Sequence, residues 1–279
     1  MKKYRGILLL TAALLGLITI DAAAQSTFTR ILGPSDQEVV PPSDSLQAHK
    51  DAAGLQEILA FVHKTSMSGL IDIRATGSAA LPAPEDQESV TAMLMAHGAD
   101  RYRLDLRTAK GTRGIRIYGT VANMKDEKGM IRSVLPQTGA SSTLVFARLG
   151  EADFSDNRVS VLDHGMVDID GASLHYVSVQ LPLALQSGNP LSKAHIVTDF
   201  YFDSNTHLLV KTADNIVLPD SAPATLLRVM TYGDYRTVNG VMVPFLYKQT
   251  LNGQLQWTVQ LDQVTVNAGV DDSSFQFTK

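Results

Sequence analysis

Two Asn-Gly dipeptides near the end of the chain, Asn239-Gly240 and Asn252-Gly253, constrain its fold more than any other feature. An Asn-Gly pair between two alternating apolar runs is typical of a two-residue hairpin turn, because both turn residues take a positive φ. The segment Met230–Phe277 is therefore predicted to form three antiparallel strands.

The last of these strands is expected to bury one face and to contain one bulge. Its apolar residues first occupy every second position and then shift by one: Leu255, Trp257, Val259 and Leu261, followed by Val264 and Val266. Side chains of a strand alternate between its two faces, so this shift reverses the buried face. One extra residue near Asp262-Gln263 restores the pattern, and we predict a β-bulge there.

The beginning of the chain has the pattern of a cleavable signal peptide. Basic residues at positions 2, 3 and 5 precede the apolar stretch Ile7–Ile20, and Ala22-Ala23-Ala24 supplies the small residues of a cleavage site. The apolar stretch is short for a bilayer span of roughly 20 residues, which disfavours an uncleaved anchor. We expect cleavage after Ala24 (residues 1–24) and a periplasmic protein that is not membrane-integral.

Charge and cysteine content narrow the classes of partner. The chain has no cysteine, which excludes lipidation at a cysteine, thiol catalysis and cysteine-ligated metals. Without the first 24 residues it has 21 basic and 27 acidic residues, a net charge of −6. A net-acidic surface without basic clusters is a poor partner for nucleic acid or anionic headgroups. Acyl chains, peptides and neutral ligands remain open, and no nucleic acid is expected. The half-barrel and the resemblance described below lead us to expect a lipid or an acylated protein as partner, with an envelope protein as a further candidate.

Three segments are expected along the chain: the signal peptide, a flexible tether at 25–45 and one domain at 46–279. The tether contains three prolines among polar residues and little periodicity. A helix is predicted from near Asp44, with Gln47 as a capping partner, to Ser66–Gly69. Its apolar stripe, which we interpret as part of a lid, consists of Leu55, Ile58, Leu59 and Val62.

The rest of the domain is dominated by short strands. Before the closing three, strands are predicted at 70–76, 89–96, 101–106, 113–118, 121–125, 130–134, 158–169, 173–181, 196–203 and 207–218. A short helix is expected at 141–149, with Leu144 as a further lid residue. We estimate roughly eleven strands and two or three helices, without a βαβ order, which predicts an antiparallel sheet. So few helices cannot cover such a sheet if it is flat, so we expect an unclosed half-barrel with helices over its mouth.

The candidate binding residues are apolar side chains expected on the inward face of this sheet. They are Met93, Met95, Tyr102, Leu104, Leu106, Ile115, Ile117, Val177 and Val179. A flexible and polarizable methionine wall suits acyl chains of variable shape. Ordinary core packing is the alternative interpretation of each of these residues.

No catalytic, metal or cofactor site is predicted. His164, Asp168, Asp170 and His175 lie in neighbouring strand segments, but alternation turns Asp168 and Asp170 outward, and Asp170-Gly171 is a natural turn. The Asp271-Asp272 pair fits the N-terminus of a helix better than a catalytic dyad. The chain contains no Gly-x-Ser-x-Gly elbow and no His-Glu-x-x-His helix.

Two stretches resemble the LolA/LolB-like superfamily of periplasmic lipoprotein carriers. Asp199–Lys211 is similar to its aromatic-rich strand, turn and Leu-rich strand, although Ser204 stands where the family has a turn proline. Tyr232–Pro244, continued to Phe275, is similar to its closing strands. The resemblance implies an unclosed β-barrel around an apolar cavity with a helical lid, and a carrier function.

Two functions from different classes follow from the sequence. The first is a non-catalytic carrier that shields a lipid, acyl chain or lipoprotein in an apolar half-barrel. The alternative is an envelope scaffold whose half-barrel is filled by its own side chains and whose open sheet edges recruit a partner. The volume enclosed by the sheet separates the two.

Overall fold

The computed structural model describes residues 50–66, 69–82, 90–98, 101–119, 121–134, 154–156, 159–182, 195–217 and 225–277. The chain divides into two units, Met1–Leu46 and Gln47–Lys279, and all of the described residues belong to the second.

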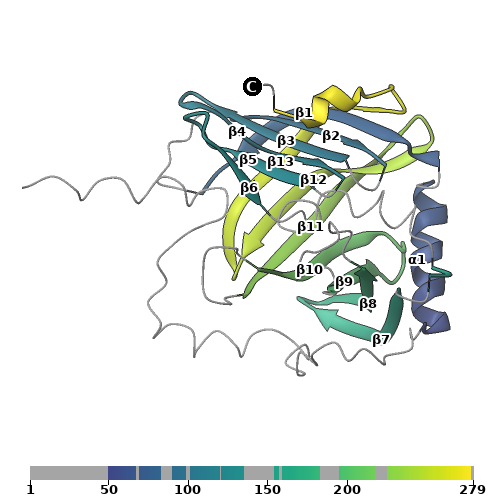
Figure 1. Cartoon of the computed structure of the whole chain (residues 1–279). Helices are drawn as coiled ribbons and strands as arrows, with labels where there is room; N and C mark the ends of the chain where they lie inside the picture. The colour runs from purple at the N-terminus through teal and green to yellow at the C-terminus, as the bar shows by residue number, and fades with distance from the viewer. Residues whose placement is uncertain are drawn as a thin grey trace, which may run out of the picture. The chain divides into compact units, whose positions relative to one another are not determined.

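The described residues form one α-helix, thirteen strands and a short 3-10 helix (Figure 1). They are α1 (Ala52–Thr65), β1 (Asp72–Ala80), β2 (Val90–His97), β3 (Arg101–Thr108), β4 (Gly111–Tyr118), β5 (Val121–Lys125), β6 (Ile131–Val134), β7 (Ser160–Ile169), β8 (Ala172–Pro182), β9 (His195–Asp203), β10 (Leu209–Val217), β11 (Thr225–Val238), β12 (Val241–Leu251), β13 (Gln254–Val266) and η5 (Asp272–Phe275).

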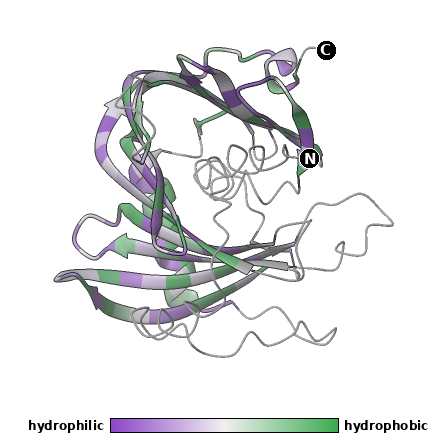
Figure 2. Cartoon of the chain, turned by 90° about the vertical axis from the view of Figure 1, so that its left-hand side faces the viewer, coloured by the Kyte–Doolittle hydropathy of each residue, from purple (hydrophilic) through white to green (hydrophobic). Residues whose placement is uncertain are grey.

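All thirteen strands belong to one antiparallel sheet with the order β6-β5-β4-β3-β2-β1-β13-β12-β11-β10-β9-β8-β7. It consists of two meanders, β1–β6 and β7–β13, which join where β1 pairs with β13. Figure 2 shows that the sheet curves strongly. In the described part of the chain, β6 and β7 are the two ends of the strand order and do not pair with each other, so the expected unclosed, curled antiparallel sheet is confirmed.

The closing strands form as the Asn-Gly turns predict. Asn239 and Gly240 have φ values of 49° and 83°, and Asn252 and Gly253 have 46° and 78°. These positive values are what a two-residue turn needs to match the twist of its flanking strands.

The predicted bulge is also present. Thr76 pairs with Gln263 and Gly77 with Leu261, which leaves Asp262 as the extra residue. A Cβ atom on Gly77 would lie 2.0 Å from the carbonyl oxygen of Gln260, so the strand opposite the bulge needs glycine.

The element count differs from the expectation in two respects. The sheet has thirteen strands, because every predicted run forms its own strand, and the described residues contain one α-helix. That helix begins at Ala52 and ends at Ser66, whose φ of 56° gives a left-handed C-cap. The second predicted helix, 141–149, lies outside the described residues.

Most buried apolar side chains lie on one face of the sheet, which we call the inner face. Its core cluster extends from Ala122 on β5 to Val161 on β7 and includes Ile58 and Phe61 of α1. A smaller cluster, formed by Leu174, Tyr176, Tyr201 and Ala213, lies on the outer face of β8–β10. Among the described helices, none has the length and apolarity to cross a membrane.

Candidate functional site

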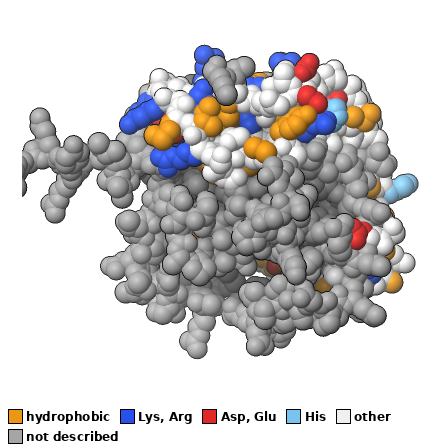
Figure 3. Space-filling model, in the orientation of Figure 1, with side chains coloured by type: hydrophobic (Ala, Val, Ile, Leu, Met, Phe, Trp, Pro, Cys, Tyr) orange, Lys and Arg blue, Asp and Glu red, His pale blue; other side chains and the backbone are white. Residues whose placement is uncertain are grey.

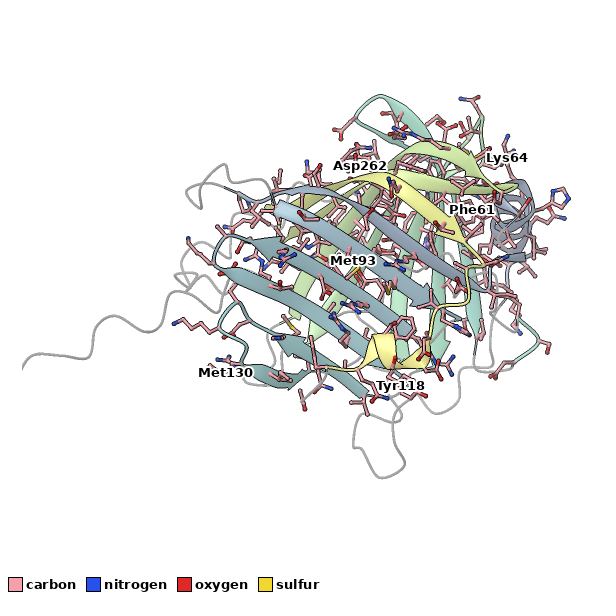
Figure 4. All side chains as sticks on the ribbon, turned by 90° about the horizontal axis from the view of Figure 1, so that it is seen from above. Phe61, Lys64, Met93, Tyr118, Met130 and Asp262 are labelled. Carbon is pink, nitrogen blue, oxygen red and sulfur yellow. The ribbon has the colours of Figure 1, made fainter. Side chains whose placement is uncertain are left out.

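Helix α1 packs on the inner face and connects distant strands of the sheet. It contacts β7 and β8 near one sheet edge, and also β12, which lies four strands further along the sheet order. Gly54 allows a close approach, since a Cβ atom there would lie 3.1 Å from Val177 and 3.2 Å from Val161. Figure 4 labels Phe61 at this contact, where its ring lies 5.5 Å from that of Phe202. The helix therefore closes one end of the curved sheet.

A chain of acidic and histidine side chains fixes the same helix. Glu57 is only 7% exposed, and its carboxylate lies 3.2 Å from His175 Nδ1 and 2.9 Å from His207 Nδ1. His175 Nε2 lies 2.8 Å from Asp163 Oδ1. The carboxylate of Asp51, just before the helix, accepts a hydrogen bond from the backbone N–H of Asp163 instead of capping α1. These polar contacts therefore fix the position of α1 on the sheet more specifically than apolar packing alone.

The buried face of α1 is rotated relative to the predicted lid stripe. Ile58 is fully buried and Val62 packs against the core, but Leu59 is 49% exposed and Leu55 is half-buried. The buried side of the helix is instead lined by Gly54, Glu57, Ile58, Phe61 and Thr65. Glu57 lies off the predicted apolar stripe, and the periodicity does not reveal the two histidines that contact it. Leu144 lies outside the described residues.

Seven of the nine predicted wall residues lie together on the inner face. They are Tyr102, Leu104, Leu106, Ile115, Ile117, Val177 and Val179, all in the core cluster. Met93 and Met95 lie on the opposite face, because Ala92, Leu94 and Ala96 take the inner positions of β2. Met95 pairs with Arg103, which also faces outward (Met93 is labelled in Figure 4). We therefore exclude both methionines from the proposed wall.

The inner face also holds a buried ion pair that the sequence reading missed. Arg228 Nε donates to Asp214 Oδ1 at 2.9 Å and Nη2 donates to Oδ2 at 2.6 Å, and the two residues are 1% and 5% exposed. Alternation along β11 already indicates that Arg228 points inward, because it lies on the same face of the strand as Met230 and Tyr232. Burial raises the pKa of the Tyr232 hydroxyl, which lies 3.3 Å from Thr212 Oγ1. The polar groups in this part of the inner face are therefore paired with each other.

A histidine, a serine and an aspartate meet on the outer face without forming a catalytic triad. Ser178 Oγ lies 2.8 Å from His164 Nε2 and donates to Asp199 Oδ1 at 2.6 Å. In a triad the carboxylate orients the histidine, whereas here it accepts directly from the serine. Burial raises the pKa of Asp199. In the described part of the chain, no group of three or more His, Cys, Asp or Glu residues could hold a metal ion.

Comparison with known proteins finds similarity at the level of structure. No protein-family model and no curated protein matches the sequence. A lipoprotein-sorting protein domain from Vibrio parahaemolyticus, described as a putative outer-membrane one, matches with a TM-score of 0.49 and 10% identity, over 80% of this chain and 96% of that one. A LolA superfamily protein from Nitrosomonas europaea matches with a TM-score of 0.49 and 8% identity, over 79% and 97%. A DUF1329 family protein from Desulfovibrio piger matches with a TM-score of 0.47 and 10% identity, over 80% and 97%.

Proposed function

We propose that this chain is a non-catalytic carrier that shields an acyl chain or another apolar group against the inner face of its sheet. The observation that carries the proposal is an inner face whose buried apolar side chains extend from β5 to β7, interrupted at β10 and β11 by the Arg228–Asp214 pair. The one described helix packs mainly against β7, β8 and β12. The wall formed by β3 and β4 lies well away from these strands in the sheet order.

The energetics suit reversible shielding. Removing apolar surface from water contributes about 25 cal/mol per Å², or roughly 0.8 kcal/mol for each buried CH₂ group. A chain of only a few carbons would therefore gain several kcal/mol on the inner face. Movement of α1 would uncover the part of the wall that lies on β8, Val177 and Val179, because the helix packs on that strand. On the pattern of its first 24 residues, we also propose that the protein works in the periplasm.

The second candidate is a scaffold with a self-filled interior. Ring packing on the inner face favours it: Phe61 contacts Phe202, and Tyr232 lies edge-on to Tyr247 at 5.8 Å. Such contacts use side-chain surface that a ligand would otherwise cover.

Native mass spectrometry of protein purified under native conditions distinguishes the two candidates. A carrier is expected to retain lipid that is absent after refolding from denaturant. Leu104→Phe, on the inner face, should lower the amount of retained lipid several-fold, whereas Met93→Phe, on the outer face, should not. Lipid-free native protein, or equal loss of lipid in both variants, would exclude the carrier and leave the scaffold.

The one tryptophan of the chain gives a second readout. Trp257 is 4% exposed and lies in the inner-face cluster. Adding a fatty acid to refolded protein should change its emission in a saturable manner.

A further inference from the structure

Positive charge is concentrated at one end of the sheet. Strands β3–β6 and their turns, residues 101–134, contain nine Lys or Arg and three Asp or Glu, a net charge of +6, whereas the whole chain has a net charge of −4. The expectation of no basic cluster is wrong for this segment: the excess lies in consecutive residues, and the sheet places its four strands side by side.

The three carboxylates of this region are buried or partly buried, and each accepts hydrogen bonds. Asp105 is 6% exposed and accepts hydrogen bonds from Arg103 and Arg116. Half-buried Asp126 accepts from two backbone N–H groups of its own turn. Glu127, also half-buried, accepts from Thr108 Oγ1 at 3.2 Å. Among the described residues of 101–134, the exposed charged side chains are all basic: Arg107, Lys110, Lys128 and Arg132.

Two hairpin turns bring several of these cations to one end of the strands. The bond between Thr108 and Glu127 joins the β3–β4 turn to the β5–β6 turn. The turns are closely packed, since a Cβ atom on Gly111 would lie 2.3 Å from the carbonyl oxygen of Glu127. Lys110 and Lys128, one in each turn, therefore lie at the same end of the sheet.

Exposed apolar side chains lie among the cations. Met130 and Ile131, which follow the β5–β6 turn, are 49% and 45% exposed. Ile131 pairs with Lys125 across the hairpin, and Arg132 Nη2 lies 3.5 Å from Met130 Sδ. We call Lys110, Lys125, Lys128, Met130, Ile131 and Arg132 the basic tip. Met130 is labelled in Figure 4, and Figure 3 shows basic and hydrophobic side chains side by side over this part of the sheet.

We propose that the basic tip docks the protein on the surface of an anionic phospholipid bilayer. Exposed lysines and arginines are attracted to acidic headgroups within a Debye length. Apolar side chains among them insert at the boundary between headgroups and acyl chains, which strengthens binding. A nucleic-acid backbone would match the charge but offers no apolar layer for Met130 and Ile131. The proposal does not depend on the carrier function, because docking needs no bound ligand.

Co-sedimentation of the chain without its first 24 residues with lipid vesicles tests the proposal. The protein should sediment with phosphatidylcholine vesicles that contain 30% phosphatidylglycerol, and much less with pure phosphatidylcholine or in 0.5 M salt. Lys110→Glu combined with Lys128→Glu should weaken this binding at least about tenfold. The matched control is Lys64→Glu combined with Lys248→Glu, which changes two exposed lysines elsewhere by the same charge.

A second pair of variants tests the apolar part. Ile131→Ser should weaken vesicle binding several-fold, whereas Val197→Ser, at a residue that is 48% exposed on β9, should leave it unchanged. Thermal unfolding of each variant verifies that the fold is retained. Equal losses in tip and control variants, equal binding to neutral and anionic vesicles, or binding to duplex DNA but not to vesicles would each overturn the proposal.

Discussion

At the residue scale, Asp199 carries the clearest consequence for stability. It lies between β8 and β10 on the outer face, and burial is the main reason that its pKa is raised above the ordinary carboxyl value. A raised pKa means that the folded state binds the proton more tightly than the unfolded state. The ionised carboxylate therefore costs stability, and this cost develops as the pH rises through the unfolded and then the folded pKa.

We predict that Asp199→Asn stabilises the fold near neutral pH. Asparagine keeps an oxygen that can accept the hydrogen bond from Ser178 but carries no charge to desolvate. The gain should shrink as the pH falls below the ordinary carboxyl range, where Asp199 is protonated in both states. Urea unfolding of both proteins at pH 7 and pH 4 measures it, and an equal or larger gain at pH 4 would contradict the argument.

Residue patterns predicted backbone features better than side-chain partners. The positive φ values of the Asn-Gly turns and the bulge at Asp262 follow from local sequence, because turn geometry and strand alternation are local properties. The buried pairing of Glu57 and that of Arg228 could not be predicted in this way. Each depends on a partner on another element, His175 and Asp214, which only the assembled sheet brings near.

At the scale of elements, helix α1 and strand β2 show where periodicity succeeds and fails. The helix was recognised from its apolar spacing, but its buried side was misplaced by about one residue position, so Leu59 faces solvent. Strand β2 has apolar residues on both faces from Ala92 to Ala96, so alternation could not decide which face is inner. Pairing decides it, because Leu94 lies opposite Leu104 and Met95 opposite Arg103.

The rotated face of α1 gives a prediction with an internal control. Phe61→Ala should lower the free energy of unfolding by about 3–5 kcal/mol, since it removes a fully buried ring from the core cluster. Leu59→Ala, two residues earlier in the same helix, should change it by less than about 0.5 kcal/mol. Denaturant titrations followed by circular dichroism measure both values, and similar losses would place Leu59 in the core after all.

At the scale of the whole molecule, the curled sheet could be predicted from the sequence, but what occupies the space inside it could not. Thirteen strands with one buried face and few helices must curve to remove that face from water. Alternation identifies the side chains that point inward, but not whether they meet each other or a ligand. The charge excess at β3–β6 is visible in the sequence, but which of its cations reach solvent is not, because that depends on the carboxylates that the turns and neighbouring strands bring near.

The open sheet also predicts an order of local stability across the molecule. Strand β12 is paired on both sides along most of its length, whereas β6 has four residues and is paired only with β5. Amide protons open to solvent more easily where fewer buried contacts and hydrogen bonds hold the backbone. In hydrogen exchange followed by mass spectrometry, β6 should therefore exchange fastest of the strands, and β11–β13 should exchange slowest. Strand β7, the other edge, should exchange quickly except near Asp163, whose N–H donates a hydrogen bond to the carboxylate of Asp51. Exchange in β12 as fast as in β6 would mean that the sheet opens as one unit instead of from its edges.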